Sequence, residues 1–154
     1  MAKEIERKYL AHGTAWKALA VGVLYRQGYL SVDKERTVRV RVAGDRGFIT
    51  VKGPSAGITR TEFEYEIPLA DANAMLDELC IKPLIEKMRH CVPCPEGVWE
   101  IDEFLGENEG LVVAEIELPD QDAQVVLPGW IGREVSDDPR YFNSSLISHP
   151  FRNW

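Results

Sequence analysis

The sequence predicts a mainly β (α+β) protein, folded as a closed eight-stranded antiparallel β-barrel with a few peripheral helices. Eight segments of the 154-residue chain alternate between polar and apolar side chains, which is the pattern of strands. Turn sequences rich in Gly separate several of these segments. Glu-x-Glu occurs in the first and in the last of them, and these two become neighbours if the sheet closes. We expect a single domain over residues 1–154.

The predicted strands place residues i, i+2 and i+4 on one face of the sheet. They cover residues 4–10, 25–31, 37–42, 47–52, 61–67, 84–90, 98–104 and 112–118. The sequence Gly-Asp-Arg-Gly at 44–47 favours a tight hairpin, and residues 53–57 favour a looser one. Two further turns are expected at 94–97 and 106–110.

Three short helices are predicted around these strands. Thr14 is a candidate N-cap for a helix whose apolar residues run from Trp16 to Leu24 at helical spacing. Asp71 is the candidate N-cap of a second helix that ends near Leu79. The third is expected at 141–147, after a proline-interrupted stretch that follows the last strand.

Composition limits the partners and the compartment. The net charge is −7, and a strongly basic face for nucleic acid is therefore not expected. The sequence has no apolar run of about 20 residues, so we expect no membrane span, and the N-terminus does not resemble a signal peptide. These observations predict a cytoplasmic protein. An odd number of cysteines disfavours a disulfide framework, and the Cys91–Cys94 pair lacks the context of a redox or zinc motif.

Charged side chains share one face of nearly every predicted strand. Carboxylates dominate the first, fifth, seventh and eighth strands, and cations dominate the third, fourth and sixth. The carboxylates are Glu4, Glu6, Glu62, Glu64, Glu66, Glu100, Asp102, Glu115 and Glu117, and the cations are Lys8, Arg39, Arg41, Lys52, Lys87 and Arg89. An open sheet with this face in water is one interpretation. The alternative is a closed barrel with the charges inside.

A closed barrel would bring Glu4 and Glu6 next to Glu115 and Glu117. Carboxylates held together repel one another, and a divalent cation removes that penalty. An oxygen-only ligand set suits Mg²⁺ or Mn²⁺ better than Zn²⁺. The inward cations would likewise require an anion, and guanidinium groups match phosphate oxygens. The closed barrel therefore predicts a metal-chelated triphosphate as ligand.

The sequence resembles the CYTH superfamily, the triphosphate tunnel metalloenzymes, and it is most like the small prokaryotic inorganic triphosphatases. Glu4-Ile5-Glu6-Arg7-Lys8 matches the E-x-E-x-K signature of that family. Further matches follow in the family's order over almost the whole chain. They are Arg39-Val40-Arg41, Thr50-Val51-Lys52-Gly53, Glu62-Phe63-Glu64, Lys87-Met88-Arg89, Ile101-Asp102-Glu103-Phe104, Ala114-Glu115-Ile116-Glu117-Leu118 and the closing segment Tyr141-Phe142-Asn143-Ser144.

This resemblance implies a tunnel that binds triphosphate and a divalent metal, Mg²⁺ or Mn²⁺. The implied metal residues are Glu4, Glu6, Glu115 and Glu117, assisted by Glu62, Glu64 and Asp102. The implied phosphate-binding residues are Lys8, Arg39, Arg41, Lys52, Lys87 and Arg89. As hypothesis, Glu4, Glu6, Lys8 and Lys52 are catalytic: Glu4 or Glu6 accepts a proton from water, Lys8 stabilises the terminal phosphate and Lys52 the leaving pyrophosphate.

The expected reaction is metal-dependent hydrolysis of inorganic tripolyphosphate to pyrophosphate and phosphate, because the short chain offers no base-recognition insertion. A nucleoside-triphosphate enzyme, either a triphosphatase or a class IV-like adenylyl cyclase, is the first alternative. Thiamine triphosphatase is another; it would need an aromatic platform, for which Trp16, Tyr25, Tyr29 and Trp130 are candidates. A non-catalytic polyphosphate-binding module is a third. The apolar outer faces of the strands exceed what three short helices cover, so a homodimer is also considered.

Overall fold

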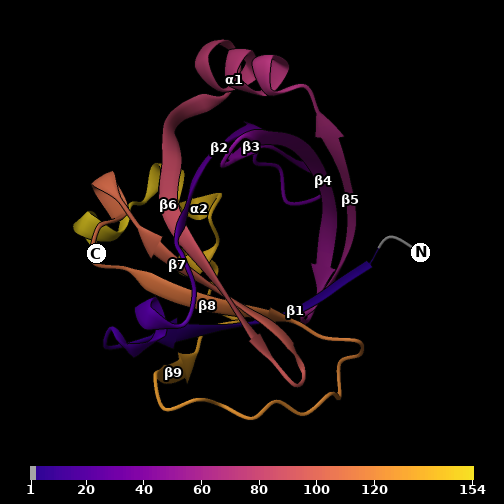
Figure 1. Cartoon of the computed structure of the whole chain (residues 1–154). Helices are drawn as coiled ribbons and strands as arrows, with labels where there is room; N and C mark the ends of the chain where they lie inside the picture. Colours follow the sequence, from indigo (N-terminus) through magenta and orange to yellow (C-terminus); the bar gives the residue numbers. More distant parts are fainter. Residues whose placement is uncertain (1–2) are drawn as a thin grey trace.

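The structure, a computed structural model, describes residues 3–154 and contains the predicted closed antiparallel barrel (Figure 1). Eight strands follow one another around it in the order β5-β4-β3-β2-β6-β7-β8-β1, and pairing of β1 with β5 closes the ring. The strands are β1 (Lys3–Ala11), β2 (Val23–Ser31), β3 (Thr37–Ala43), β4 (Arg46–Ala56), β5 (Thr59–Ile67), β6 (Ile81–Cys94), β7 (Gly97–Phe104) and β8 (Val112–Glu117). A further strand, β9 (Ile131–Glu134), extends the sheet.

Strand β1 joins the two ends of the sheet. On one edge it pairs with β8, with Glu6 opposite Glu117 and Lys8 opposite Glu115. On the other edge its first residues pair with β5, with Glu4 opposite Arg60. The predicted meeting of the first and last strands is therefore confirmed, and their charged residues face the same interior.

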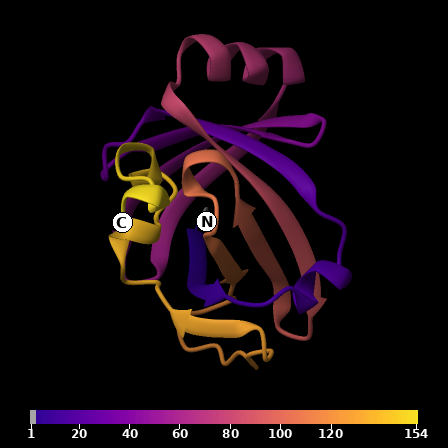
Figure 2. The same ribbon diagram turned by 90° about the vertical axis from the view of Figure 1, so that its left-hand side faces the viewer.

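Two segments cover the outer faces of several strands. Helix α1 (Leu69–Glu78) packs Ala72 and Leu76 on Val40 and Val42 of β3. On the opposite side of the barrel, residues 119–130 run across the outside of β1, β7 and β8 (Figure 1 and Figure 2). There Trp130 and its neighbours pack on a buried cluster around Trp99. The sequence analysis did not expect this irregular segment to cover a sheet face.

The C-terminal segment packs on apolar residues at one end of the barrel. It consists of the 3-10 helix η3 (Pro139–Tyr141), helix α2 (Ser145–Ser148) and the 3-10 helix η4 (Phe151–Asn153). Leu146 is fully buried in a cluster with Tyr29, Ile85 and Phe104 from three strands. This end of the interior is therefore apolar, and the charged residues occupy the rest of it.

Thr14 occupies the predicted N-cap position, without a side-chain hydrogen bond, but the helix that follows it is much shorter than expected. The structure has only the 3-10 helix η1 (Ala15–Ala18), and Val23 and Leu24 already belong to β2. Gly22 lies so close to His90 that an added Cβ would be 2.9 Å from the imidazole ring, so a residue with a side chain would not fit there without a shift. The apolar residues at helical spacing belong here to an exposed 3-10 turn, in which Trp16 alone is buried, and to the strand that follows it.

Three smaller differences concern element ends. Asp71 lies in the first turn of α1, whose N-cap position is Pro68. The helix predicted at 141–147 is divided into η3 and α2, and η2 (Gly106–Asn108) forms in the expected turn at 106–110. Strand β9 was not predicted; it pairs with the second half of β1, with Ala11 opposite Ile131. No helix in residues 3–154 is both long and apolar enough to cross a bilayer.

Candidate active site

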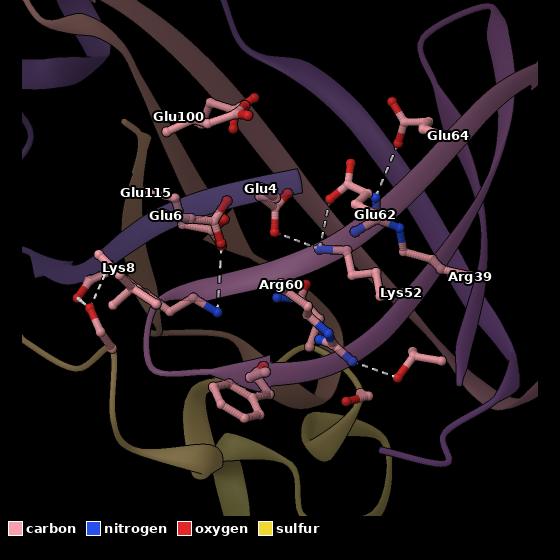
Figure 3. A pocket seen from close by; sticks show the side chains of 18 of the residues that line it. Glu4, Glu6, Lys8, Arg39, Lys52, Arg60, Glu62, Glu64, Glu100 and Glu115 are labelled. Carbon is pink, nitrogen blue, oxygen red and sulfur yellow. Dashed lines mark hydrogen bonds and ion pairs between the residues drawn. The ribbon is translucent and has the colours of Figure 1, made fainter. Parts of the chain in front are cut away.

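A charged cavity of about 230 Å³ occupies the interior of the barrel (Figure 3). All but one of the predicted site residues line it, although they come from six strands. They are Glu4, Glu6, Lys8, Arg39, Arg41, Lys52, Glu62, Glu64, Lys87, Arg89, Glu115 and Glu117. The exception is Asp102, which lies behind the cavity wall.

Three carboxylates form the tightest acidic group. Glu6, Glu100 and Glu115 come from β1, β7 and β8, and one oxygen of each lies within 4.8 Å of the others. Burial and the charge of Glu115 raise the pKa of Glu6 well above its ordinary value. Burial acts in the same direction on Glu115, but Lys8 at 3.6 Å and a hydrogen bond from Glu6 hold its pKa well below the usual range.

This acidic group fits a divalent cation. Two neighbouring carboxyls whose pKa values are driven apart share a proton, and a bound cation would replace that proton and the repulsion together. The donors are all oxygens, which is the ligand chemistry of Mg²⁺ and Mn²⁺. Sequence reasoning placed Glu100 on the charged face but not among the metal residues.

A second acidic group surrounds Lys52. The Lys52 Nζ atom lies 3.1 Å from Glu4 Oε1 and 3.4 Å from Glu62 Oε2. Burial and a hydrogen bond to Glu4 raise the pKa of Glu62 to about 7. Glu117 lies at a more exposed position, where burial and the charge of Glu4 raise its pKa. Of these carboxyls, Glu62 is the one that could release a proton near neutral pH when a cation binds.

Two arginines of β3 extend along the opposite wall. Arg39 and Arg41 each place Nη2 3.4 Å from Glu64 Oε2, which also accepts a 2.7 Å hydrogen bond from Thr50. Burial and the charges of Arg39 and Arg89 lower the pKa of Arg41 to about 10. The Nε atoms of Arg39 and Arg41 are buried without a hydrogen-bond partner among residues 3–154. One carboxylate thus faces two guanidinium groups, and an anion in the cavity would balance the excess.

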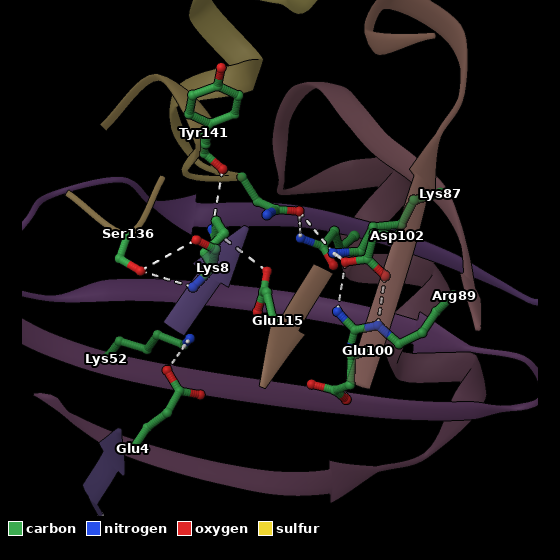
Figure 4. Close-up of polar contacts among 12 residues, drawn as sticks. Glu4, Lys8, Lys52, Lys87, Arg89, Glu100, Asp102, Glu115, Ser136 and Tyr141 are labelled. Atoms are coloured by element: carbon green, nitrogen blue, oxygen red, sulfur yellow. Dashed lines mark hydrogen bonds and ion pairs between the residues drawn. The ribbon is translucent and has the colours of Figure 1, made fainter. Parts of the chain in front are cut away.

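Asp102 holds two other cations of the cavity in place (Figure 4). Its carboxylate accepts hydrogen bonds of 2.7 and 2.8 Å from Arg89 and lies 2.8 Å from Lys87 Nζ. Asp102 is fully buried, and its pKa lies below the ordinary value because Arg89 and Lys87 outweigh the effect of burial. Both of its oxygens are therefore engaged by cations.

Several cavity residues were missed by sequence reasoning. Arg60 donates to the Gly53 carbonyl at 2.5 Å and to Thr37 at 2.8 Å. It lies two residues before Glu62, so the same alternation would have found it had the predicted strand begun earlier. Asn143 reaches the cavity from the C-terminal segment, which no strand periodicity could indicate.

The four aromatic candidates for a thiamine platform are placed differently. Trp16 is fully buried, and Trp130 packs with it in the cluster outside the barrel. Tyr29 lines the cavity but belongs to the apolar end and is almost fully buried. The ring of Tyr25 already lies against the guanidinium groups of Arg41 and Arg89, at 5.1 and 4.7 Å.

A closed barrel that gathers carboxylates and cations into one interior cavity defines a tunnel-type binding protein for charged ligands. The sequence profile of the CYTH domain matches residues 2–148, and the chain belongs to this family. Two curated relatives are both named inorganic triphosphatase. The one from Acetivibrio thermocellus is 58% identical over 154 residues, covering 100% of this chain and 99% of the relative. The one from Nitrosomonas europaea is 34% identical over 147 residues, covering 93% and 95%.

Solved structures share the fold. The crystal structure of the inorganic triphosphatase NE1496 superposes with a TM-score of 0.64 at 32% identity and covers 96% of this chain and 95% of that one. A protein from Pyrococcus horikoshii gives a TM-score of 0.59 at 18% identity, with 77% and 80% covered. The similarity to the Pyrococcus horikoshii protein shows a shared fold only.

Proposed function

We propose that the protein hydrolyses inorganic tripolyphosphate to pyrophosphate and phosphate with the help of Mg²⁺ or Mn²⁺. One observation carries the proposal: the Glu6, Glu100 and Glu115 group lies in the same cavity as seven cationic side chains. A bound metal would compensate the negative charge of the carboxylates, and a bound polyphosphate would compensate the positive charge of the cations. Two full-length relatives named inorganic triphosphatase support the same substrate.

Glu6, Glu100 and Glu115 would hold the metal, with Glu4, Glu62, Glu64 and Glu117 within the same cavity as further oxygen ligands, directly or through water. A bound divalent cation neutralises phosphate charge and makes a water molecule more acidic. We do not place Asp102 among the ligands, because Lys87 and Arg89 engage both of its oxygens. Its proposed role is to fix these two cations.

The cations bind the phosphate chain and stabilise the charge that develops during hydrolysis. Lys8, Arg39 and Arg41 face the terminal phosphate in this proposal, and Lys52, Lys87 and Arg89 face the leaving pyrophosphate. Most of them are tethered by carboxylates, for example Lys52 by Glu4 at 3.1 Å. Charges fixed in this way need little rearrangement when the reaction occurs.

Proton transfer from the attacking water is assigned to Glu4 or Glu6 on β1. Both side chains project into the cavity beside Lys8 and Lys52 (Figure 3). The proton would pass from water to this carboxylate as the bond from the water oxygen to the terminal phosphorus forms. The bond from that phosphorus to the bridging oxygen breaks in the same step, and pyrophosphate leaves with the electron pair.

The cavity favours the inorganic substrate over an organic triphosphate. Its volume of about 230 Å³ lies below the roughly 300 Å³ at which sites for organic ligands usually begin. Tyr25 already contacts two guanidinium groups, and Trp16 and Trp130 lie outside the barrel. None of these three rings is therefore offered to a base or to thiamine.

A panel assay tests the proposal. Tripolyphosphate, ATP, GTP and thiamine triphosphate are each incubated with Mg²⁺, Mn²⁺ or a chelator, and the products are identified. We expect the highest kcat/KM with tripolyphosphate, equal amounts of phosphate and pyrophosphate, and no turnover with the chelator. Cyclic AMP from ATP would establish a cyclase instead. Binding of tripolyphosphate without product would establish a binding module.

The choice between Mg²⁺ and Mn²⁺, a cytoplasmic location, and the absence of nucleic-acid and membrane partners remain predictions. A homodimer also remains a prediction. Phe63 and Tyr65 on the outer face of β5 are 44% and 61% exposed, which leaves apolar surface for a second copy. Light scattering coupled to size-exclusion chromatography measures the mass in solution and tests this prediction.

A further inference from the structure

Asn143 connects the C-terminal segment to the charged interior. It lies between η3 and α2 and lines the cavity. Its Oδ1 atom accepts a 2.9 Å hydrogen bond from Lys87 Nζ and a 3.0 Å hydrogen bond from Gln27 Nε2. The side-chain oxygen of Asn143 is thus fully used by two donors from β6 and β2.

The identity of these donors fixes the orientation of the amide. A lysine ammonium can only donate, so the Asn143 atom facing Lys87 must be the oxygen and not the nitrogen. The Nδ2 group therefore points away from Lys87. It makes no hydrogen bond within residues 3–154, and it is not among the buried polar atoms that lack a partner. Nδ2 thus remains accessible, in a residue that lines the cavity.

Gln27 is oriented by the same constraint. Its side chain is fully buried and does not line the cavity. Because Asn143 presents an oxygen, Gln27 must present its Nε2 group, and its Oε1 atom is left buried without a partner among the described residues. A buried amide with an unpaired oxygen is unfavourable for the fold.

The same segment also contacts Lys8, a second lysine of the cavity. Lys8 Nζ donates to the Tyr141 carbonyl at 3.2 Å and lies 5.5 Å from the centre of the Phe142 ring. Asn143 Nδ2 therefore belongs to a segment that touches both Lys8 and Lys87. A neutral donor at this place can bind a phosphate oxygen without adding to the repulsion among the cations.

We propose that Asn143 is a substrate-binding residue whose Nδ2 donates to an oxygen of the phosphate chain, and that Gln27 is a positioning residue that, together with Lys87, holds the Asn143 amide in this orientation. This inference rests on the proposed function. It adds an uncharged donor from the C-terminal segment to the cations supplied by the strands.

The variant Asn143→Asp separates binding from support of the fold. Aspartate keeps an oxygen for Lys87 and Gln27 but replaces the donor with a second oxygen. We expect KM for tripolyphosphate to rise at least about tenfold, with kcat changed by less than about threefold and an unchanged melting temperature. Ser144→Asp places the same charge one residue along the cavity wall and should raise KM less than about threefold. Equal effects of the two variants, or an unchanged KM in Asn143→Asp, would overturn the proposal.

A double-mutant cycle tests Gln27. Gln27→Leu removes the amide that orients Asn143, at a residue that does not line the cavity. We expect Gln27→Leu to raise KM by about threefold to tenfold in the wild-type background, and to have no further effect in Asn143→Ala. Additive effects in the double variant would show that Gln27 acts independently of Asn143. If Gln27→Leu does not fold, Gln27→Met is used in the same cycle.

Calorimetry tests the role of Asn143 in binding independently of the proposed reaction. Tripolyphosphate binding to wild type and to Asn143→Asp is measured in the presence of a chelator, so that no hydrolysis is required. At least about tenfold weaker binding by the variant supports the role of Asn143 even if the wild-type enzyme hydrolyses another triphosphate. Equal affinities contradict the role even if tripolyphosphate proves to be the substrate.

Discussion

Lys87 and Asp102 form a fully buried ion pair behind the cavity, with Nζ and Oδ2 2.8 Å apart and both side chains only 1% exposed. Asp102 also binds Arg89 through two hydrogen bonds (Figure 4). One carboxylate therefore positions two phosphate-binding cations before any ligand enters. Its removal would leave two buried positive charges with less compensation.

Substitution Asp102→Ala should lower the free energy of unfolding by about 3–5 kcal/mol, because it leaves Lys87 and Arg89 buried without their main partner. Urea denaturation measures this loss. Glu103→Ala is the matched control from the same strand. Glu103 pairs with Lys17 on the surface, with the two side chains 34% and 42% exposed, so less than about 1 kcal/mol should be lost. Equal losses of unfolding free energy in the two variants would show that Asp102 stabilises the fold no more than the surface residue Glu103 does.

Substitution Glu6→Gln should reduce tripolyphosphate turnover by roughly a hundredfold or more, the scale of losing a metal ligand or general base. In a chelator, the same variant should melt at a higher temperature than wild type, because a buried carboxyl beside Glu115 has been removed. Phosphate release and thermal melting measure the two effects. Glu66→Gln on β5 is the control, since Glu66 pairs with Arg46 outside the cavity. Unchanged turnover in Glu6→Gln refutes the assignment.

Substitution Arg39→Ala should raise KM for tripolyphosphate by about 10- to 100-fold, the effect of losing a charged hydrogen bond to phosphate. The Arg39 side chain is only 12% exposed and faces the cavity. Arg46→Ala removes an exposed arginine whose partner is Glu66 and should leave KM unchanged. Steady-state kinetics compares the two variants. Similar KM values for both would show that Arg39 does not bind the phosphate chain.

Stabilisation by Mg²⁺ should increase with pH. The pKa values of Glu6 and Glu62 are raised from 4.5, that of Glu62 to about 7. Since both groups bind protons more tightly in the folded state, the stability that they contribute at acid pH is lost as the pH rises above 4.5, and for Glu62 this loss extends through about pH 7. Mg²⁺ replaces these protons. The gain in melting temperature with Mg²⁺ should therefore be larger at pH 7.5 than at pH 5.5, and equal gains would contradict the metal site.

Much of the barrel and of the charged interior could be predicted because alternation along a strand is a local property. Closure of the sheet was inferred from the carboxylates of the first strand, Glu4 and Glu6, and of the last, Glu115 and Glu117. The pairing of β1 with β8 confirms this inference. The alternation also predicted that Arg39 and Arg41 would share a face, and both line the cavity.

The remaining features depend on contacts between distant residues. Asp102 has the alternation of a cavity residue, but the closeness of Lys87 and Arg89 turns its oxygens away from the cavity. Asn143 meets Gln27 across 116 residues of sequence, in a segment without strand periodicity. The short strand β9 follows a proline-interrupted stretch, and its pairing with β1 is possible because β5 leaves half of that edge free.

A crystal structure of the Glu4→Gln variant with Mn²⁺ and tripolyphosphate would test the central claim most directly, since the anomalous signal of manganese locates the ion independently of the protein. We expect the ion inside the barrel, bonded to oxygens of at least two of Glu6, Glu100 and Glu115, and the phosphate chain among Lys8, Arg39 and Arg89. An ion bound elsewhere, or a phosphate chain on the outer surface of the barrel, would contradict this account.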